Sequence, residues 1–90
     1  SLIAARQEQA KKNWVKILEI APTLADWGEK LSCEKAIAMA VPLVMARGSW
    51  AGALQISGLY KKINEEEKYR YWFAVYRRLY RDKDRKWKKY

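Results

Sequence analysis

Arginine side chains near the carboxyl end are the residues of this chain best suited to bind a ligand. Rotation by about 100° per helical residue places seven cationic residues in one sector roughly 120° wide, with Asp82 and Asp84 on its flanks. Arginine presents a planar fork of donors that matches a phosphate group. The pattern therefore predicts a cationic helix face that binds a polyanion. Its members are Arg70, Arg77, Arg78, Arg81, Arg85, Lys88 and Lys89.

Aromatic residues of the same stretch fall on a second stripe of the helix. Their steps of three, four and seven residues are typical of an amphipathic helix that buries one face. Two tyrosines outside that stripe are candidates for stacking on an exposed base. Tyr71 lies beside the cationic sector, and Tyr60 precedes Lys61 and Lys62, which we add to the predicted site. The residues assigned to the core are Trp72, Phe73, Tyr76 and Tyr80.

Few residues of this sequence suit any other chemistry. The chain has no His, so it lacks the commonest general base. With no His and one Cys, it has too few ligands for a structural zinc site. The sequence also contains no glycine-rich phosphate-binding loop and no nucleophile elbow. The three consecutive glutamates at 65–67 splay by about 100° each, so they fit helix-end charges better than a metal site. We expect no enzymatic activity, no cofactor and no bound metal.

Positive charge is concentrated at one end of the chain. The 90 residues carry a net charge of +9, and residues 69–90 hold nine basic and two acidic residues, a local charge of +7. That distribution is typical of a polyanion binder. Half of the residues are hydrophobic, which is too many for a disordered chain. We expect residues 1–90 to form one small helical domain, either processed or excised from a longer protein.

The single cysteine, Cys33, excludes an internal disulfide framework and favours a reducing, cytoplasmic location. We expect Cys33 to be a small buried hydrophobe at a helix start rather than a nucleophile. The longest apolar run, residues 36–46, is too short to span a bilayer.

Apolar residues recur at helical spacing along the chain. The alternation of period two that would indicate a strand is absent from the sequence. We predict an all-α fold: a compact bundle of four to five helices with a long amphipathic, basic C-terminal helix. Helices are expected over residues 1–21, 33–47, 50–56 and 64–90, with a single turn over 23–28.

Local signals set the expected helix boundaries. Pro22 is expected to end the first helix, and Pro42 is expected to kink or break the second. Ser57 and Gly58 are expected to form a break in the helical structure before the long helix. Gly52 weakens a helix interior, so its presence implies close packing there. The expected N-caps are Ser32, Ser49 and Asn64, and the expected terminating glycine is Gly48.

A helix-turn-helix is one way to arrange the middle of the chain, with residues 36–47 as its first helix and 50–63 as its second. The second helix would then offer only Gln55, Lys61 and Lys62 to a DNA groove. We therefore favour contacts to the nucleic-acid backbone from the C-terminal helix over base reading by an internal one.

The leading hypothesis is a nucleic-acid-binding helical module with mainly electrostatic, weakly sequence-specific contacts, with DNA favoured over RNA. Such a module would suit a larger replication, recombination or defence protein, or a nucleoprotein assembly. The first alternative is a protein-interaction or oligomerisation module that uses the aromatic stripe. Binding to a membrane surface is the second alternative, disfavoured because the fold needs the aromatic face. The simplest non-functional interpretation is a solvated basic face stabilised by i,i+4 pairs such as Arg78–Asp82.

Overall fold

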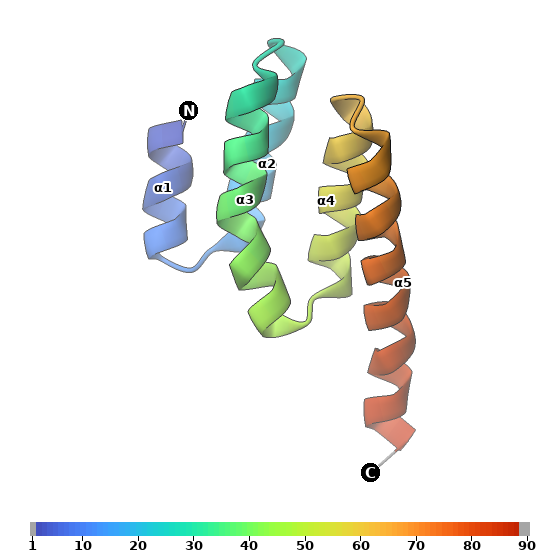
Figure 1. Cartoon of the computed structure of the whole chain (residues 1–90). Helices are drawn as coiled ribbons and strands as arrows, with labels where there is room; N and C mark the ends of the chain where they lie inside the picture. Colours follow the sequence, from blue (N-terminus) through green and yellow to red (C-terminus); the bar gives the residue numbers. More distant parts are fainter. Residues whose placement is uncertain (1, 89–90) are drawn as a thin grey trace.

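Apolar residues at helical spacing form five helices whose buried sides share one core. The computed structural model describes the backbone of residues 2–88 and the side chains of residues 3–83. That part of the chain contains no strand, and the predicted all-α bundle with a long C-terminal helix is confirmed (Figure 1). The helices are α1 (Leu2–Ala10), α2 (Trp14–Asp26), α3 (Lys30–Arg47), α4 (Trp50–Lys62) and α5 (Glu66–Lys88).

The core lies where α2, α3 and α4 meet. Ile17 of α2, Ile37 and Val44 of α3, and Ile56 of α4 are fully buried, and α1 covers α2 and α3 with Ala5. Among the described helices, α5 lies beside α4 alone, and it continues past the end of the others (Figure 1). The molecule is flat, with extents of 45 × 30 × 14 Å. The outer side of α5 therefore faces solvent.

Two helices replace the single helix expected over residues 1–21. The chain turns at Lys12, which has a left-handed φ of 58°. The Asn13 side chain then accepts a hydrogen bond of 3.4 Å from the backbone N–H of Lys16 and caps α2. An asparagine in this role satisfies one of the free donors of the first helical turn. The boundary was missed because the apolar spacing on its two sides happens to fit one continuous helix.

Neither proline breaks a helix. Pro22 lies inside α2, which continues to Asp26, and Pro42 lies inside α3. The proline ring fits a helical φ, and its main costs are one lost backbone hydrogen bond and crowding against the preceding turn. Burial of Leu24 after Pro22, and of Val44 after Pro42, favours continuing each helix. The expected boundary at Pro22 is therefore wrong, and of the kink or break expected at Pro42 the break does not occur.

The third helix begins earlier than expected, at Lys30, so Ser32 lies within its first turn rather than at its N-cap. Glu29 occupies the N-cap position without a side-chain capping hydrogen bond. Gly28, with a φ of 74°, turns the chain between α2 and α3. Cys33 is fully buried as expected, and this burial raises the pKa of its thiol.

The fourth helix is continuous over the positions where an interruption was expected. The Ser49 hydroxyl accepts a hydrogen bond of 3.1 Å from the Gly52 N–H, which confirms the predicted N-cap. It follows Gly48, whose φ of 61° closes α3 as expected. Ser57 does not interrupt α4, because its buried hydroxyl donates to the Leu54 carbonyl at 2.7 Å and is satisfied within the helix.

Asn64 ends α4 instead of capping α5. Its φ of 63° is left-handed, and its N–H donates to the Lys61 carbonyl at 3.1 Å. The N–H of Glu65 donates to the Tyr60 carbonyl at 2.8 Å, which together with the left-handed residue forms a Schellman-type helix end. The next helix begins at Glu66. Asparagine suits both a helix start and a left-handed helix end, so the residue type alone does not separate the two roles.

Two glycines inside α4 have opposite surroundings. A Cβ placed on Gly52 would lie 2.7 Å from Val44 Cγ2 and 3.3 Å from Trp14 Cζ3, so the predicted close packing at Gly52 is confirmed. A Cβ placed on Gly58 would meet nothing within 4 Å. Gly52 is thus required where α3 and α4 approach each other, whereas Gly58 is not constrained by packing.

Alanine at these two positions is expected to change stability in opposite directions. Gly52→Ala should destabilise the fold by about 1–3 kcal/mol, because a buried, β-branched Val44 has little room to move. Gly58→Ala should stabilise it by about 0.5–1 kcal/mol, because alanine loses less backbone entropy in a helix. Urea unfolding followed by circular dichroism measures both changes. Equal shifts of the same sign would contradict this account of the α3–α4 contact.

Candidate nucleic-acid interface

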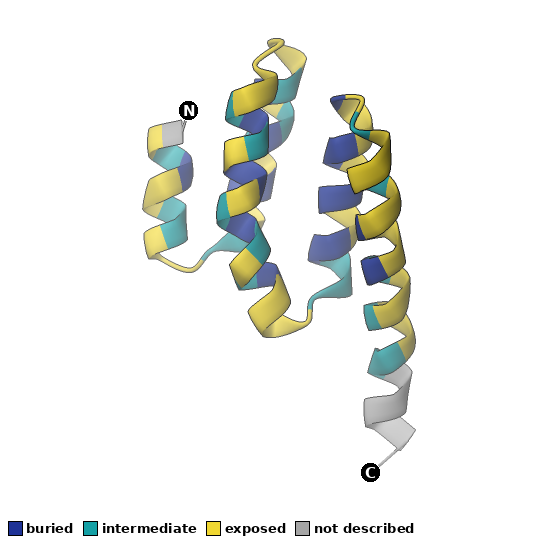
Figure 2. Ribbon diagram, in the orientation of Figure 1, coloured by how far each residue is buried: buried dark blue, intermediate teal, exposed yellow. Residues whose placement is uncertain are grey.

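The long helix α5 buries one narrow face and exposes the rest. Trp72 and Val75 are buried against the molecule, and Tyr76 and Leu79 are half-buried beside them. Figure 2 shows buried positions of α5 on the side that faces α4 and exposed positions on its outer side. Since α4 is the only described helix next to α5, no other described element covers that outer side.

Three arginines gather on the outer side of α5, as the sequence predicts. Arg77, Arg78 and Arg81 are exposed and, with Ala74, line a shallow hollow of about 400 Å³. These positions follow one another at helical spacing, and the short side chain of Ala74 leaves space between the longer ones. No described carboxylate forms an ion pair with any of the three, and the anticipated Arg78–Asp82 pair does not form. We call Arg77, Arg78 and Arg81 the arginine face.

Arg70 and Tyr71 lie one to two turns closer to the start of α5. Arg70 is exposed and pairs with Glu66 at 3.6 Å, so its charge is partly compensated. Tyr71 is 64% exposed, and its ring contacts Trp72 edge-on with centroids 5.8 Å apart. Neither residue lines the hollow of the arginine face.

The remaining predicted site residues on α5 cannot be placed with the arginine face. Arg85 and Lys88 belong to α5 by their backbone, but their side chains lie outside the described residues, as does Lys89 altogether. Their membership of the interface stays a prediction.

The lysines near the α4–α5 turn are engaged within the fold. Lys62 pairs with Asp26 of α2 at 2.6 Å, and Lys61 Nζ lies 5.1 Å from the centre of the Tyr69 ring. Both lysines lie in the last turn of α4, whereas Arg81 lies in the second half of α5 (Glu66–Lys88). The structure therefore does not bring Lys61 and Lys62 together with the arginine face.

Tyr60 is buried, so it cannot stack on a base as proposed from the sequence. Burial also raises the pKa of its hydroxyl. Its ring contacts Lys68, whose Nζ lies 5.6 Å from the ring centre. Tyr60 thus contributes to the α4–α5 contact rather than to a binding surface.

Two aromatic residues assigned to the core are on the surface instead. Phe73 is 36% exposed and Tyr80 is 42% exposed. Together with Tyr76, Arg77 and Arg81 they line a second hollow of about 410 Å³, which we call the aromatic groove. The assignment failed because the aromatic stripe of α5 is wider than the surface that the single helix α4 covers. The useful sequence signal was the width of the stripe, since a buried stripe spans roughly 100°.

Trp50, at the start of α4, packs against two of the rings that line this groove. Its ring lies edge-on to Tyr80, with centroids 5.1 Å apart, and 6.2 Å from that of Tyr76. Lys83 Nζ lies 4.3 Å from the Tyr80 ring centre and 5.3 Å from that of Trp50. These contacts hold Tyr76 and Tyr80 in place while leaving part of Tyr80 exposed.

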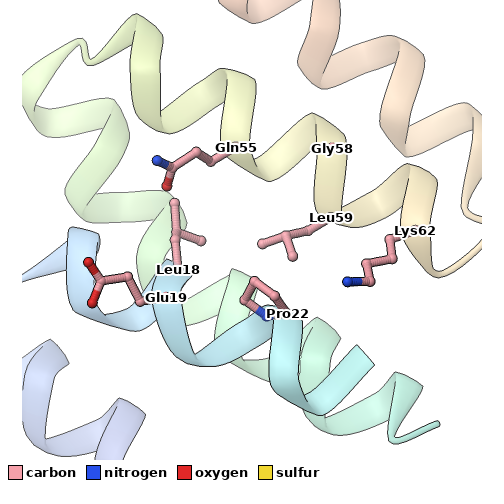
Figure 3. Close-up of a pocket in the computed structure, with 7 residues that line it drawn as sticks. All are labelled: Leu18, Glu19, Pro22, Gln55, Gly58, Leu59 and Lys62. Atoms are coloured by element: carbon pink, nitrogen blue, oxygen red, sulfur yellow. The ribbon is translucent and has the colours of Figure 1, made fainter. Parts of the chain in front are cut away.

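A separate groove of about 500 Å³ lies between α2 and α4, away from the arginines. Figure 3 shows Leu18 and Pro22 of α2 on one side and Leu59 of α4 on the other, with Glu19 and Lys62 at its edges. Its lining is mainly apolar and its charges are of both signs. It offers no concentration of charge comparable to that of the arginine face.

Two ion pairs connect the α4–α5 hairpin to the rest of the molecule. Lys62–Asp26 joins α4 to α2, and Lys30 Nζ lies 2.9 Å from a Glu65 carboxylate oxygen, which joins α3 to the α4–α5 turn. The hydrogen bond from Lys30 lowers the pKa of the Glu65 carboxyl and raises that of Lys30. These pairs lie at the base of α5 and help fix its direction.

The described residues contain no cluster of three or more His, Cys, Asp or Glu side chains arranged to hold a metal ion. None of the helices in this part of the chain is long and apolar enough to cross a bilayer. Comparison with protein-family models, with curated proteins and with solved structures finds no match to this chain. The functional argument therefore depends on the residues themselves.

The Lys30–Glu65 pair predicts a specific pH dependence of stability. The pKa of Glu65 is lower in the folded protein than in the unfolded chain. Its contribution to folding stability is therefore present above the ordinary glutamate pKa of about 4.3, and it is lost as the pH falls through the lowered pKa of the folded protein. The pKa of Lys30 is raised in the folded protein. Its contribution to folding stability is therefore present below the ordinary lysine pKa, and it is lost as the pH rises through the raised pKa of the folded protein. Glu65→Gln should therefore be less stable than wild type at neutral pH, and the difference should shrink in acid.

Urea midpoints measured for both proteins across this acidic range test the prediction. Glu19→Gln is the matched control, because Glu19 pairs with Lys16 at 3.4 Å on the exposed surface of one helix. Its effect at neutral pH should be smaller, since exposed pairs within a helix contribute little. An equal effect of the two variants at every pH would contradict a role for Glu65 in holding the hairpin.

Proposed function

We propose that this chain is a nucleic-acid-binding helical module whose arginine face contacts phosphates. The observation that carries the proposal is the exposure of Arg77, Arg78 and Arg81 on one side of α5, without an ion pair to any described carboxylate. Ordinary surface cations of a soluble helix are usually interspersed with acids. Three guanidinium groups around one small residue, with no ion pair to a described carboxylate, instead favour binding to several phosphate oxygens.

The contacts would be mainly electrostatic and weakly dependent on sequence. A 23-residue helix is roughly 34 Å long, so α5 can follow a nucleic-acid backbone over several phosphates. Contacts of this kind gain affinity by releasing counterions and carry no base information themselves. We favour DNA over RNA as the ligand, a non-enzymatic role and a cytoplasmic location, the last because of the lone Cys33.

A role within a larger replication, recombination or defence protein, or in a nucleoprotein assembly, is part of the same proposal. Electrostatic contacts from one short helical module would supply local affinity. Linkage to a second binding module would raise the overall affinity through effective concentration.

The second candidate is a protein-interaction module or homo-oligomer, favoured by the partly exposed Phe73 and Tyr80. Arg77 and Arg81 border the same groove, so a protein partner would need acidic groups beside an apolar segment. Two copies meeting through this face would oppose their own arginines, which disfavours self-association. Membrane binding is less favoured, because α4 occupies the most apolar side of α5.

Replacing the arginine face is expected to remove most nucleic-acid affinity. The Arg77→Gln, Arg78→Gln and Arg81→Gln triple variant should bind a duplex of about 20 base pairs at least roughly tenfold more weakly than wild type at about 50 mM salt. Its slope of log affinity against log salt should be smaller by about 3, because three phosphate contacts are lost. Fluorescence anisotropy at about 50 and about 200 mM salt measures both quantities.

A second triple variant controls for the change in net charge. Arg6, Lys35 and Arg47 are exposed, lie outside α5 and form no ion pair among the described side chains. Their replacement by glutamine removes the same three charges and should change the affinity only slightly. If the two triple variants lose affinity equally, net charge rather than the arginine face is responsible. If neither loses affinity, the interface lies elsewhere.

A further inference from the structure

We infer that the ligand of α5 is single-stranded rather than duplex nucleic acid, with bases stacked in the aromatic groove and phosphates on the adjoining arginines. This inference rests on the proposed function and specifies the form of nucleic acid that the same face recognises. The features that carry it are the exposed rings of Phe73 and Tyr80 and their position beside Arg77 and Arg81.

The groove presents a run of rings along the helix. The Phe73 and Tyr76 centroids are 5.5 Å apart, and those of Tyr76 and Tyr80 are 6.0 Å apart. Phe73 and Tyr80 are the exposed ends of this run, and the hollow of about 410 Å³ lies within the roughly 300–1,000 Å³ range of sites for small organic groups. A row of aromatic surfaces of this kind is sequence-tolerant, because every base has a flat face that can stack.

Aromatic residues and arginines form two parallel rows on α5. Arg77 directly follows Tyr76, and Arg81 directly follows Tyr80, so each arginine is rotated by about 100° from the preceding ring. Arg77 and Arg81 line both the aromatic groove and the hollow of the arginine face. Among the described side chains, no acidic residue lines either hollow. One strand lying along the helix would therefore place its bases on one row and its phosphates on the other.

Other occupants match only half of this surface. A duplex offers phosphates, but its stacked bases have no free faces for Phe73 and Tyr80. A second copy of the chain offers rings, but its own Arg77 and Arg81 would repel those already present. An anionic bilayer takes up helices through a broad apolar face, and on α5 that face, with Trp72 and Val75, is buried. A single strand supplies both negative charge and flat apolar surface.

The test compares four probes on one protein: an oligothymidylate of about 20 nucleotides, an abasic strand of equal length, a duplex of equal length, and vesicles of phosphatidylserine and phosphatidylcholine. Wild type should bind the oligothymidylate most tightly. The Phe73→Leu, Tyr80→Leu double variant keeps apolar side chains but removes the rings. Its dissociation constant for oligothymidylate should rise roughly 30-fold or more, because two stacked bases are lost at about 1 kcal/mol or more each. Its affinity for the abasic strand and the duplex should change by less than about twofold.

Trp27→Leu is the matched control, because Trp27 is 75% exposed at the end of α2, far from the groove in the sequence, and its removal should leave binding unchanged. If the double variant unfolds by circular dichroism, Phe73→Leu alone is used, since the Phe73 ring contacts only Tyr69 and Tyr76 among the described rings. The single variant should still weaken oligothymidylate binding by about fivefold or more.

The outcomes separate this inference from the proposed function. Equal affinity of wild type for the abasic strand, the duplex and the oligothymidylate would overturn the single-strand inference and leave the proposed function standing. Oligothymidylate binding that is insensitive to Phe73→Leu would do the same. Absence of binding to every oligonucleotide, with or without vesicle binding, would overturn both.

Discussion

Helix α5 has a single helical neighbour in the described chain, and the properties of the candidate site depend on this constraint. A helix in the middle of a bundle buries most of its circumference, whereas α5 buries only the side that meets α4. Trp72 and Val75 fill that contact, and the aromatic residues next to them extend beyond it. The arginines on the remaining side stay exposed. The flat arrangement of the five helices thus produces a cationic surface and an adjoining aromatic one on a single rod.

Lysine and arginine have different positions around this rod, and their chemistry accounts for the division. Lys61, Lys68 and Lys83 lie over aromatic rings and stabilise the packing of α4 and α5, whereas Lys62 pairs with Asp26 and joins α4 to α2. The guanidinium groups at 77, 78 and 81 make no such contact among the described side chains. Since guanidinium is planar and less strongly hydrated than ammonium, it is the better group to leave free for phosphate.

Local signals in the sequence predict some features of this fold and fail at others for identifiable reasons. Gly48, Ser49 and Gly52 were correctly interpreted because each has one favourable backbone or packing role at its position. Pro22 and Asn64 were misinterpreted because tertiary burial, or a second backbone role for the same residue type, decided the outcome. For the site, helical spacing alone predicted the arginine face. The exposure of Phe73 and Tyr80 was missed, because it depends on how many helices surround α5, and the width of the aromatic stripe was its only sequence signal.

The partly uncovered aromatic groove is a surface of the kind that favours aggregation, and the arginines beside it oppose that tendency. An exposed apolar surface attracts other apolar surfaces without regard to their origin. Here Arg77 and Arg81 line the groove itself, so an approaching protein copy with a net charge of +9 meets repulsion before it reaches the rings. The same two charges attract a ligand that is negative. Under the proposed function, the arginines beside the groove would set selectivity by repelling like molecules, and the rings would add affinity only for a ligand that combines negative charge with a flat apolar surface.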